Sequence, residues 1–102
     1  MSNTDTMTLQ EASNAVLTID MRYRSLTHIN DKEDLKPTRD QAFASYTLAR
    51  LALLEARVMT TQDDVEEMKA LRAEIERAAD LQTLLLATGR VIGFFAKLAA
   101  RV

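Results

Sequence analysis

His28 is the first residue to consider for chemistry, because it is the only histidine in the sequence. A histidine phosphoacceptor on a helical bundle needs a nearby lysine and small neighbours that let a partner approach. The stretch around it reads Leu26-Thr27-His28-Ile29-Asn30-Asp31 and supplies neither. We interpret His28 as an ordinary polar residue near the end of a helix, where its cationic form is mildly stabilising.

Metal-ligand residues are equally sparse, since the chain contains no cysteine and only this one histidine. A metal site needs clustered ligands, and no acidic residue stands three or four positions before His28. The acidic pairs Asp63-Asp64 and Glu66-Glu67 are adjacent, so their side chains point in different directions on a helix. The sequence therefore predicts no metal and no cofactor.

Four arginines, Arg22, Arg24, Arg50 and Arg57, are candidates for a clamp on an anionic substrate. Arg50 and Arg57 share one helix face, however, and an exposed basic stripe of this kind is normally only solvated. Catalysis needs polar groups that converge in a cleft, and no motif here indicates one. We predict that the protein is not an enzyme and has no catalytic residues.

The overall charge also restricts function. The net charge is −2 and the isoelectric point is about 5.3, whereas duplex binding draws most of its affinity from basic contacts to phosphate. We therefore predict no nucleic-acid partner. The first seven residues are polar and lack the pattern of a secretory signal, which predicts a cytoplasmic protein.

The elements that position these side chains are predicted to be helices. Of 102 residues, 47% are hydrophobic, while only two are glycine and one is proline, so long uninterrupted helices are favoured over a sheet with many turns. We expect an all-α bundle of three long antiparallel helices plus a short C-terminal helix. The predicted domain spans residues 8–102 after a flexible lead at 1–7, and its helices span about 8–30, 39–59, 62–88 and 90–101.

Four local signals set these boundaries. Thr8–Glu11 has the spacing of a capping box, and Thr61–Asp64 resembles a helix cap. The charged stretch 30–37 ends in Pro37, which disfavours helix at the residue before it. Gly89 is suited to the left-handed residue that ends many helices.

Hydrophobic spacing identifies the faces that should be buried. The first helix carries a 3–4 spaced seam of Leu9, Ala12, Val16, Ile19, Tyr23 and Leu26. In the second helix Phe43, Tyr46, Leu51, Leu54 and Val58 are predicted to line one side, and Leu48, Ala52 and Leu53 broaden the apolar surface. This breadth predicts contacts with neighbours on more than one side.

The C-terminal segment 90–102 reads as a basic amphipathic helix. Arg90, Lys97 and Arg101 fall within roughly 40° of one another on a helical projection, and they define a basic face. A separate apolar flank is formed by Val91, Phe95, Leu98 and Val102. This flank is expected to dock on the bundle or on a second copy of the chain, with an anionic membrane surface as the alternative.

The sequence thus favours a small helical interaction or assembly module. We predict a homo-oligomer, with a dimer favoured, and an unidentified protein partner is a further option. The predicted interaction residues are Phe43, Tyr46, Val91, Phe94, Phe95 and Leu98. The alternative is a peripheral membrane protein that uses residues 84–102, whose apolar stretch is interrupted by Arg90 near its middle and so is poorly suited to spanning.

Overall fold

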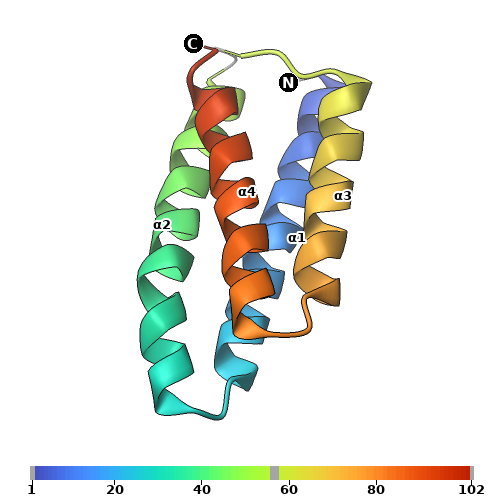
Figure 1. The fold of residues 1–102 in the computed structure, drawn as a ribbon. Helices are drawn as coiled ribbons and strands as arrows, with labels where there is room; N and C mark the ends of the chain where they lie inside the picture. The colour runs from blue at the N-terminus through green and yellow to red at the C-terminus, as the bar shows by residue number, and fades with distance from the viewer. Residues whose placement is uncertain (1, 56–57, 102) are drawn as a thin grey trace.

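The computed structural model describes residues 2–55 and 58–101. Met1, Ala56, Arg57 and Val102 lie outside the described residues, and with them the start of the predicted lead, one arginine of the predicted clamp and one residue of the apolar flank. The described residues form four helices: α1 (Asn3–Ser25), α2 (Ile29–Leu54), α3 (Gln62–Arg77) and α4 (Leu81–Ala99) (Figure 1). The predicted all-α bundle is confirmed.

The four helices are arranged as two hairpins that pack side by side. Short turns join α1 to α2 and α3 to α4, and these pairs are antiparallel (Figure 1). The connection from α2 to α3 crosses one end of the bundle, so α1 packs against α3 and α2 packs against α4. In these two pairs the helices run in the same direction, an arrangement that the predicted antiparallel bundle did not include.

Helix α1 begins earlier than predicted, because Ser2 and Asp5 form a capping box. The Ser2 hydroxyl accepts a hydrogen bond from the Asp5 amide at 3.2 Å, and the Asp5 carboxylate accepts one from the Ser2 amide at 3.2 Å. The predicted flexible lead is therefore wrong for residues 3–7, which are helical. Thr8 is not a cap but lies fully buried inside α1.

Helix α2 runs through the segment that was predicted to break. It starts at Ile29 and contains Pro37, which lacks an amide hydrogen and leaves one carbonyl of the preceding turn without its helical partner. Leu35 and Ala42, on either side of this proline, are both fully buried on the same face of α2. Burial of that face against the bundle offsets the local cost, and the break falls at residues 26–28 instead.

The boundary between the last two helices also differs from the prediction, which placed it at Gly89. Thr61 caps α3 with a capping box that includes Asp64, as predicted. Helix α3 ends at Arg77, however, and Asp80 caps α4 by accepting a 2.8 Å hydrogen bond from the amide of Thr83. Gly89 lies inside α4, so the predicted helix end at this residue is wrong, and so is the predicted short terminal helix.

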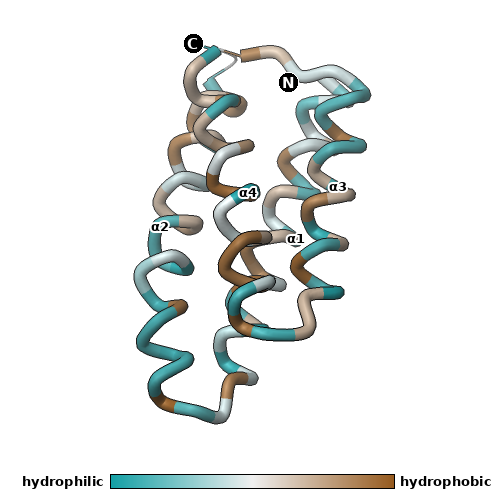
Figure 2. The backbone as a smooth tube through the Cα atoms, viewed as in Figure 1, coloured by the Kyte–Doolittle hydropathy of each residue, from teal (hydrophilic) through white to brown (hydrophobic). Residues whose placement is uncertain are grey.

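The core is built from the inward faces of all four helices, and Figure 2 shows apolar segments on each of them. Helix α4 contributes the two buried aromatic side chains, Phe94 and Phe95. The ring of Phe95 lies 5.8 Å from that of Tyr46 on α2 and 6.4 Å from that of Phe94. The predicted seam of α1 is confirmed, since its residues are buried or packed against the core.

Helix α2 presents mainly small side chains to this core. Its buried residues are Leu35, Ala42, Ala49, Ala52 and Leu53. Leu51 and Leu54, predicted to face inward, are 41% and 47% exposed, and Leu48 is 61% exposed. The prediction is correct for Phe43 and Tyr46, which pack against the core, and wrong for Leu51 and Leu54. Val58 is buried but lies beyond Leu54, where α2 ends, so the predicted helix end at 59 is also wrong. The alanines give the aromatic rings of α4 room to approach α2, and the leucines face outward.

Candidate interaction surface

The residues predicted to contact another chain lie within the bundle. Val91, Phe94, Phe95 and Leu98 are all at most 3% exposed, and they pack against the core of the same chain. Phe43 and Tyr46 are partly buried and pack against that core. The apolar flank of α4 therefore docks on its own bundle, one of the two arrangements expected, while contacts of these residues with a second chain stay a prediction.

The basic face of the C-terminal segment is paired with acidic side chains of α3. The pairs are Arg90–Glu74 at 2.8 Å, Lys97–Glu67 at 3.0 Å and Arg101–Asp64 at 2.8 Å. Because the two helices are antiparallel, the order of the bases along α4 and just beyond it is the reverse of the order of the acids on α3. The basic face thus lies along α3 over the length of the hairpin, paired with its acidic side chains.

The pair between Arg101 and Asp64 is the most enclosed of the three. The guanidinium donates to both carboxylate oxygens at 2.8 Å and to the carbonyl of Met59 at 3.2 Å. These hydrogen bonds from Arg101 lower the pKa of Asp64 to about 2, and the bond from the Thr61 amide acts in the same direction against the effect of burial. Arg101, just beyond α4, is thereby fastened to the start of α3.

A second carboxylate fixes the crossing connection at the same end of the bundle. Asp5 on α1 accepts hydrogen bonds from the amide of Thr60 at 2.9 Å and from its hydroxyl at 2.6 Å. Burial raises the pKa of Asp5, but the hydrogen bonds from Thr60 and Ser2 outweigh it, and the net pKa lies below the usual value. Asp5 and Asp64 therefore both anchor this end of the bundle through their hydrogen bonds.

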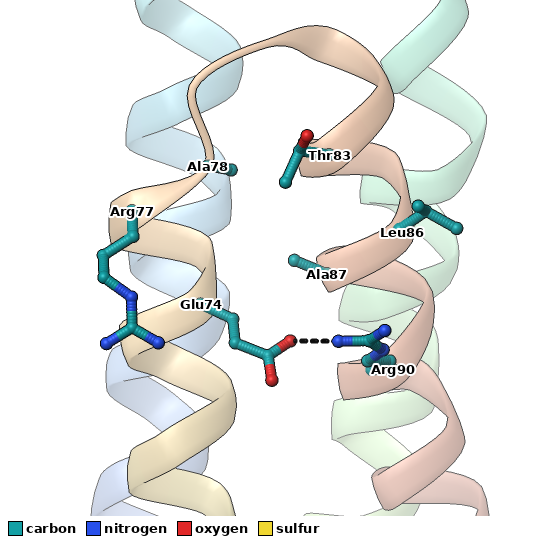
Figure 3. Close-up of a pocket in the computed structure, with 7 residues that line it drawn as sticks. All are labelled: Glu74, Arg77, Ala78, Thr83, Leu86, Ala87 and Arg90. Carbon is teal, nitrogen blue, oxygen red and sulfur yellow. Dashed lines mark hydrogen bonds and ion pairs between the residues drawn. The ribbon is translucent and has the colours of Figure 1, made fainter.

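A shallow hollow of about 210 Å³ lies between α3 and α4 near their connecting turn (Figure 3). Its lining residues are Glu74, Arg77, Ala78, Thr83, Leu86, Ala87 and Arg90. Figure 3 shows the carboxylate of Glu74 reaching across the hollow to the guanidinium of Arg90, so the two central charges neutralise each other. The Arg77 side chain lies on the α3 side of the hollow and does not reach across it (Figure 3).

A second hollow of about 250 Å³ lies between α1 and α3, bordered by Gln10, Glu11 and Lys69 among others. Glu11 is paired there with Arg72 at 3.1 Å. Both hollows are smaller than the roughly 300–1,000 Å³ of typical small-molecule sites. Neither collects polar groups in the mutual geometry that catalysis requires.

The structure does not bring Arg22, Arg24 and Arg50 together, and these are the candidate arginines among the described residues. Arg22 donates to backbone carbonyls at the end of α3, and Arg24 pairs with Asp20 at 2.8 Å. Arg50 is exposed on α2, and Arg57 lies outside the described residues. His28 is the exposed N-cap residue of α2, and its side chain makes no capping hydrogen bond.

Acidic side chains at the start of α3 serve the fold. Asp64 belongs to the cap and Glu67 pairs with Lys97, while Glu66 accepts a 2.9 Å hydrogen bond from Gln62. Within residues 2–55 and 58–101, no group of three or more histidine, aspartate or glutamate side chains is placed to hold a metal ion.

The feature that sequence reasoning missed is an uncharged surface on the outside of α2 and α4, which we name the outer face. It consists of Ala44, Leu48 and Leu51 on α2, of Gly89, Gly93 and Ala96 on α4, and of the C-cap residue Ala100, all of them exposed. On each helix these residues fall within about 60° on a helical projection. The spacing of the small residues on α4 is visible in the sequence, but which way α2 turns its leucines is not.

The outer face has a raised side and a low side. The leucines project from α2, whereas the glycines and alanines leave the backbone of α4 close to the surface. A Cβ atom added at Gly89 or Gly93 would meet nothing within 4 Å, so the packing of the single chain does not require glycine at either position.

No family model, curated protein or solved structure matches the chain.

Among the described residues, α4 is long and apolar enough to cross a membrane by length and composition. The same property is expected of a core helix, and α4 supplies the buried aromatic residues of this bundle.

Proposed function

We propose that the protein is a helical self-assembly module that associates through the outer face of α2 and α4. The observation that carries this proposal is the orientation of α2, which buries alanines and exposes Leu48 and Leu51. Exposed apolar surface that is contiguous and free of charge is typical of a protein contact.

The free energy gained by burying the exposed leucines favours coverage of the outer face by another surface. Full burial of a leucine side chain is worth roughly 1.5–3 kcal/mol. Leu48 is 61% exposed and Leu51 is 41% exposed in the single chain, so a large part of this free energy is available only when another surface covers them. The neighbouring small residues of α4 extend the same face without adding any charge to be desolvated.

A peripheral membrane role through residues 84–102 is the second candidate, favoured by the length and apolar character of α4. Against it stands the pairing of Arg90, Lys97 and Arg101 with carboxylates of α3, which leaves less positive charge for anionic lipid. Sedimentation with anionic vesicles at low salt separates the two candidates, because only the membrane role predicts binding that falls as salt rises.

The test of the self-assembly module is solution mass by light scattering on the full chain and on Leu48→Glu. We expect the full chain to have about twice its monomer mass of 11.4 kDa and Leu48→Glu to be a monomer, because a carboxylate would be desolvated in the contact. A wild-type chain that remains a monomer up to about 100 µM would contradict the proposal, since association would then be weaker than typical specific contacts.

The matched control is Leu17→Glu, which changes another exposed leucine, 55% exposed, on the outside of α1. This variant should keep the dimer mass. Point variants are preferable to a truncation after Thr88, because such a truncation would remove Val91, Phe95 and Leu98 from the core. Loss of the dimer in both variants would show that any added surface charge disrupts it, and the outer face would lose its support.

A further inference from the structure

We propose that the partner of the outer face is a second copy of this chain, related by a two-fold axis parallel to the helices, with the α2 leucines of each copy seated on the glycine–alanine side of α4 in the other. This inference rests on the proposed self-assembly function and specifies its geometry. A two-fold interface requires a surface that is complementary to itself. The outer face meets this requirement because its raised side and its low side lie next to each other.

The heights of the two sides match. Helices α2 and α4 run in the same direction, and the ring of Tyr46 lies 5.8 Å from that of Phe95. Both helices rise about 1.5 Å per residue, and a ring reaches about one turn along its helix, so Leu48 lies level with the stretch 93–97, which carries Gly93 and Ala96. A two-fold axis parallel to the helices preserves height and exchanges α2 with α4, which places Leu48 of one copy opposite Gly93 and Ala96 of the other.

Charges at the two rims agree with the same axis. Asp40 on α2 lies at the rim toward α1, and Arg90 on α4 lies at the rim toward α3. The contact between Tyr46 and Phe95 places them within about one helical turn of each other in height. Their side chains are 45% and 63% exposed, although each already has a partner within its own chain. The axis brings Asp40 of each copy toward Arg90 of the other, so opposite charges meet at both edges.

The area is sufficient for a dimer. Helix α4 has 19 residues, which gives a face about 28 Å long, and two adjacent helices present a width of roughly 20 Å. Two such faces would bury about 1,100 Å² in total, which exceeds the ~1,000 Å² expected of a biological interface. A second copy can therefore cover the outer face with no additional partner.

Cysteine cross-linking tests the axis, and the chain is suited to it because it contains no cysteine. Leu48→Cys and Ala96→Cys are made separately in the full chain, mixed under reducing conditions to exchange, and oxidised with a copper catalyst. Light scattering of each reduced variant checks that it still forms the dimer. We expect a covalent dimer that joins one chain of each kind, because a disulfide requires Cβ atoms only about 3.5–4.5 Å apart.

The outcomes separate the geometry from the function. A dimer in which Ala96→Cys cross-links mainly to itself would place α4 against α4 of the partner, and it would overturn this inference while leaving self-assembly intact. A dimer with no cross-link at either position would also overturn it. A wild-type chain that is monomeric by light scattering would overturn both proposals.

Ala96→Leu provides a second measurement that does not depend on disulfide geometry. Position 96 is exposed in the single chain, so thermal unfolding of the monomer should be unchanged, while the added side chain fills the space for the partner's Leu48. The dimer dissociation constant should rise about tenfold or more. An unchanged dissociation constant would contradict close packing of Leu48 on Ala96.

Discussion

The guanidinium of Arg22 on α1 donates a 2.6 Å hydrogen bond to the carbonyl oxygen of Ala78, just beyond the end of α3. It also donates to the carbonyl of Ile75 at 2.7 Å. The last carbonyls of a helix have no partners within the helix, so Arg22 supplies a C-cap from a different helix. The end of α3 and the position of the α3–α4 turn are thus fixed by a residue more than fifty positions away in sequence.

Replacement of Arg22 by methionine keeps much of the aliphatic stem but removes the capping hydrogen bonds. We expect the free energy of unfolding to fall by about 2 kcal/mol, since hydrogen bonds to charged groups contribute roughly 1.5–3 kcal/mol. Urea unfolding monitored by circular dichroism measures the change. Arg24→Met is the control, because Arg24 pairs only at the surface with Asp20 and should change stability little. Equal effects of the two substitutions would contradict the capping role.

The pair between Arg101 and Asp64 predicts a loss of stability in acid. The pKa of Asp64 is lowered to about 2 in the folded chain from an ordinary value of 3.8. Its stabilising contribution is therefore present above about pH 4 and is lost as pH falls toward 2. We expect Asp64→Asn to lose about 1–2 kcal/mol at pH 7, allowing for the partial exposure of Arg101. The difference between variant and wild type should shrink near pH 2, and a difference that is constant with pH would argue against this pair.

Much of the fold was predictable from local patterns. The α1 seam and the Thr61 cap depend on spacing within a few residues, and both were predicted correctly. The ion pairs of the α3–α4 hairpin also had a signal in the sequence. The acids at 64, 67 and 74 and the bases at 90, 97 and 101 have similar spacings in reverse order, which is the pattern expected of an antiparallel pair.

The misplaced boundaries depend on contacts between distant residues. Pro37 indicates a break by its own chemistry, and only the burial of Leu35 and Ala42 on a shared face explains why α2 continues through it. The outer face could not be predicted for the same reason. Leu51 and alanines such as Ala49 are both apolar, so their own chemistry does not show which of them faces the core. That choice depends on how α2 packs against α1 and against the aromatic rings of α4.

Pro37 offers a direct test of this explanation. A proline in a helix interior is about 3 kcal/mol less favourable than alanine, while proline lowers the entropy of the unfolded chain by an amount worth about 0.4–1 kcal/mol. Pro37 is exposed on α2, so Pro37→Ala should leave packing intact and raise the free energy of unfolding by about 2 kcal/mol. Thermal and urea unfolding measure the gain. Destabilisation by Pro37→Ala would show that α2 needs the bend or rigidity of proline.

Phe95→Ala distinguishes a core residue from an interface residue. The ring is fully buried against Tyr46 and Phe94 in the same chain, so its removal should lower the free energy of unfolding by about 3–5 kcal/mol. Because this loss is a large fraction of the stability of a small domain, folding should be compromised before self-association is affected. A variant with unchanged unfolding but weaker association would instead place Phe95 between chains.

The glycines of α4 should respond to alanine with two opposite effects. In the single chain Gly89 and Gly93 lie in a helix interior with nothing near the position of a Cβ atom, so each alanine should stabilise the monomer by about 0.5–1 kcal/mol. At the proposed interface the same methyl group of Gly93→Ala would separate the backbones and weaken the dimer. Unfolding at dilute concentration measures the first effect, and the dimer dissociation constant measures the second. If Gly93→Ala raised both the free energy of unfolding of the monomer and the affinity of the dimer, Gly93 would not be in close contact with a partner helix.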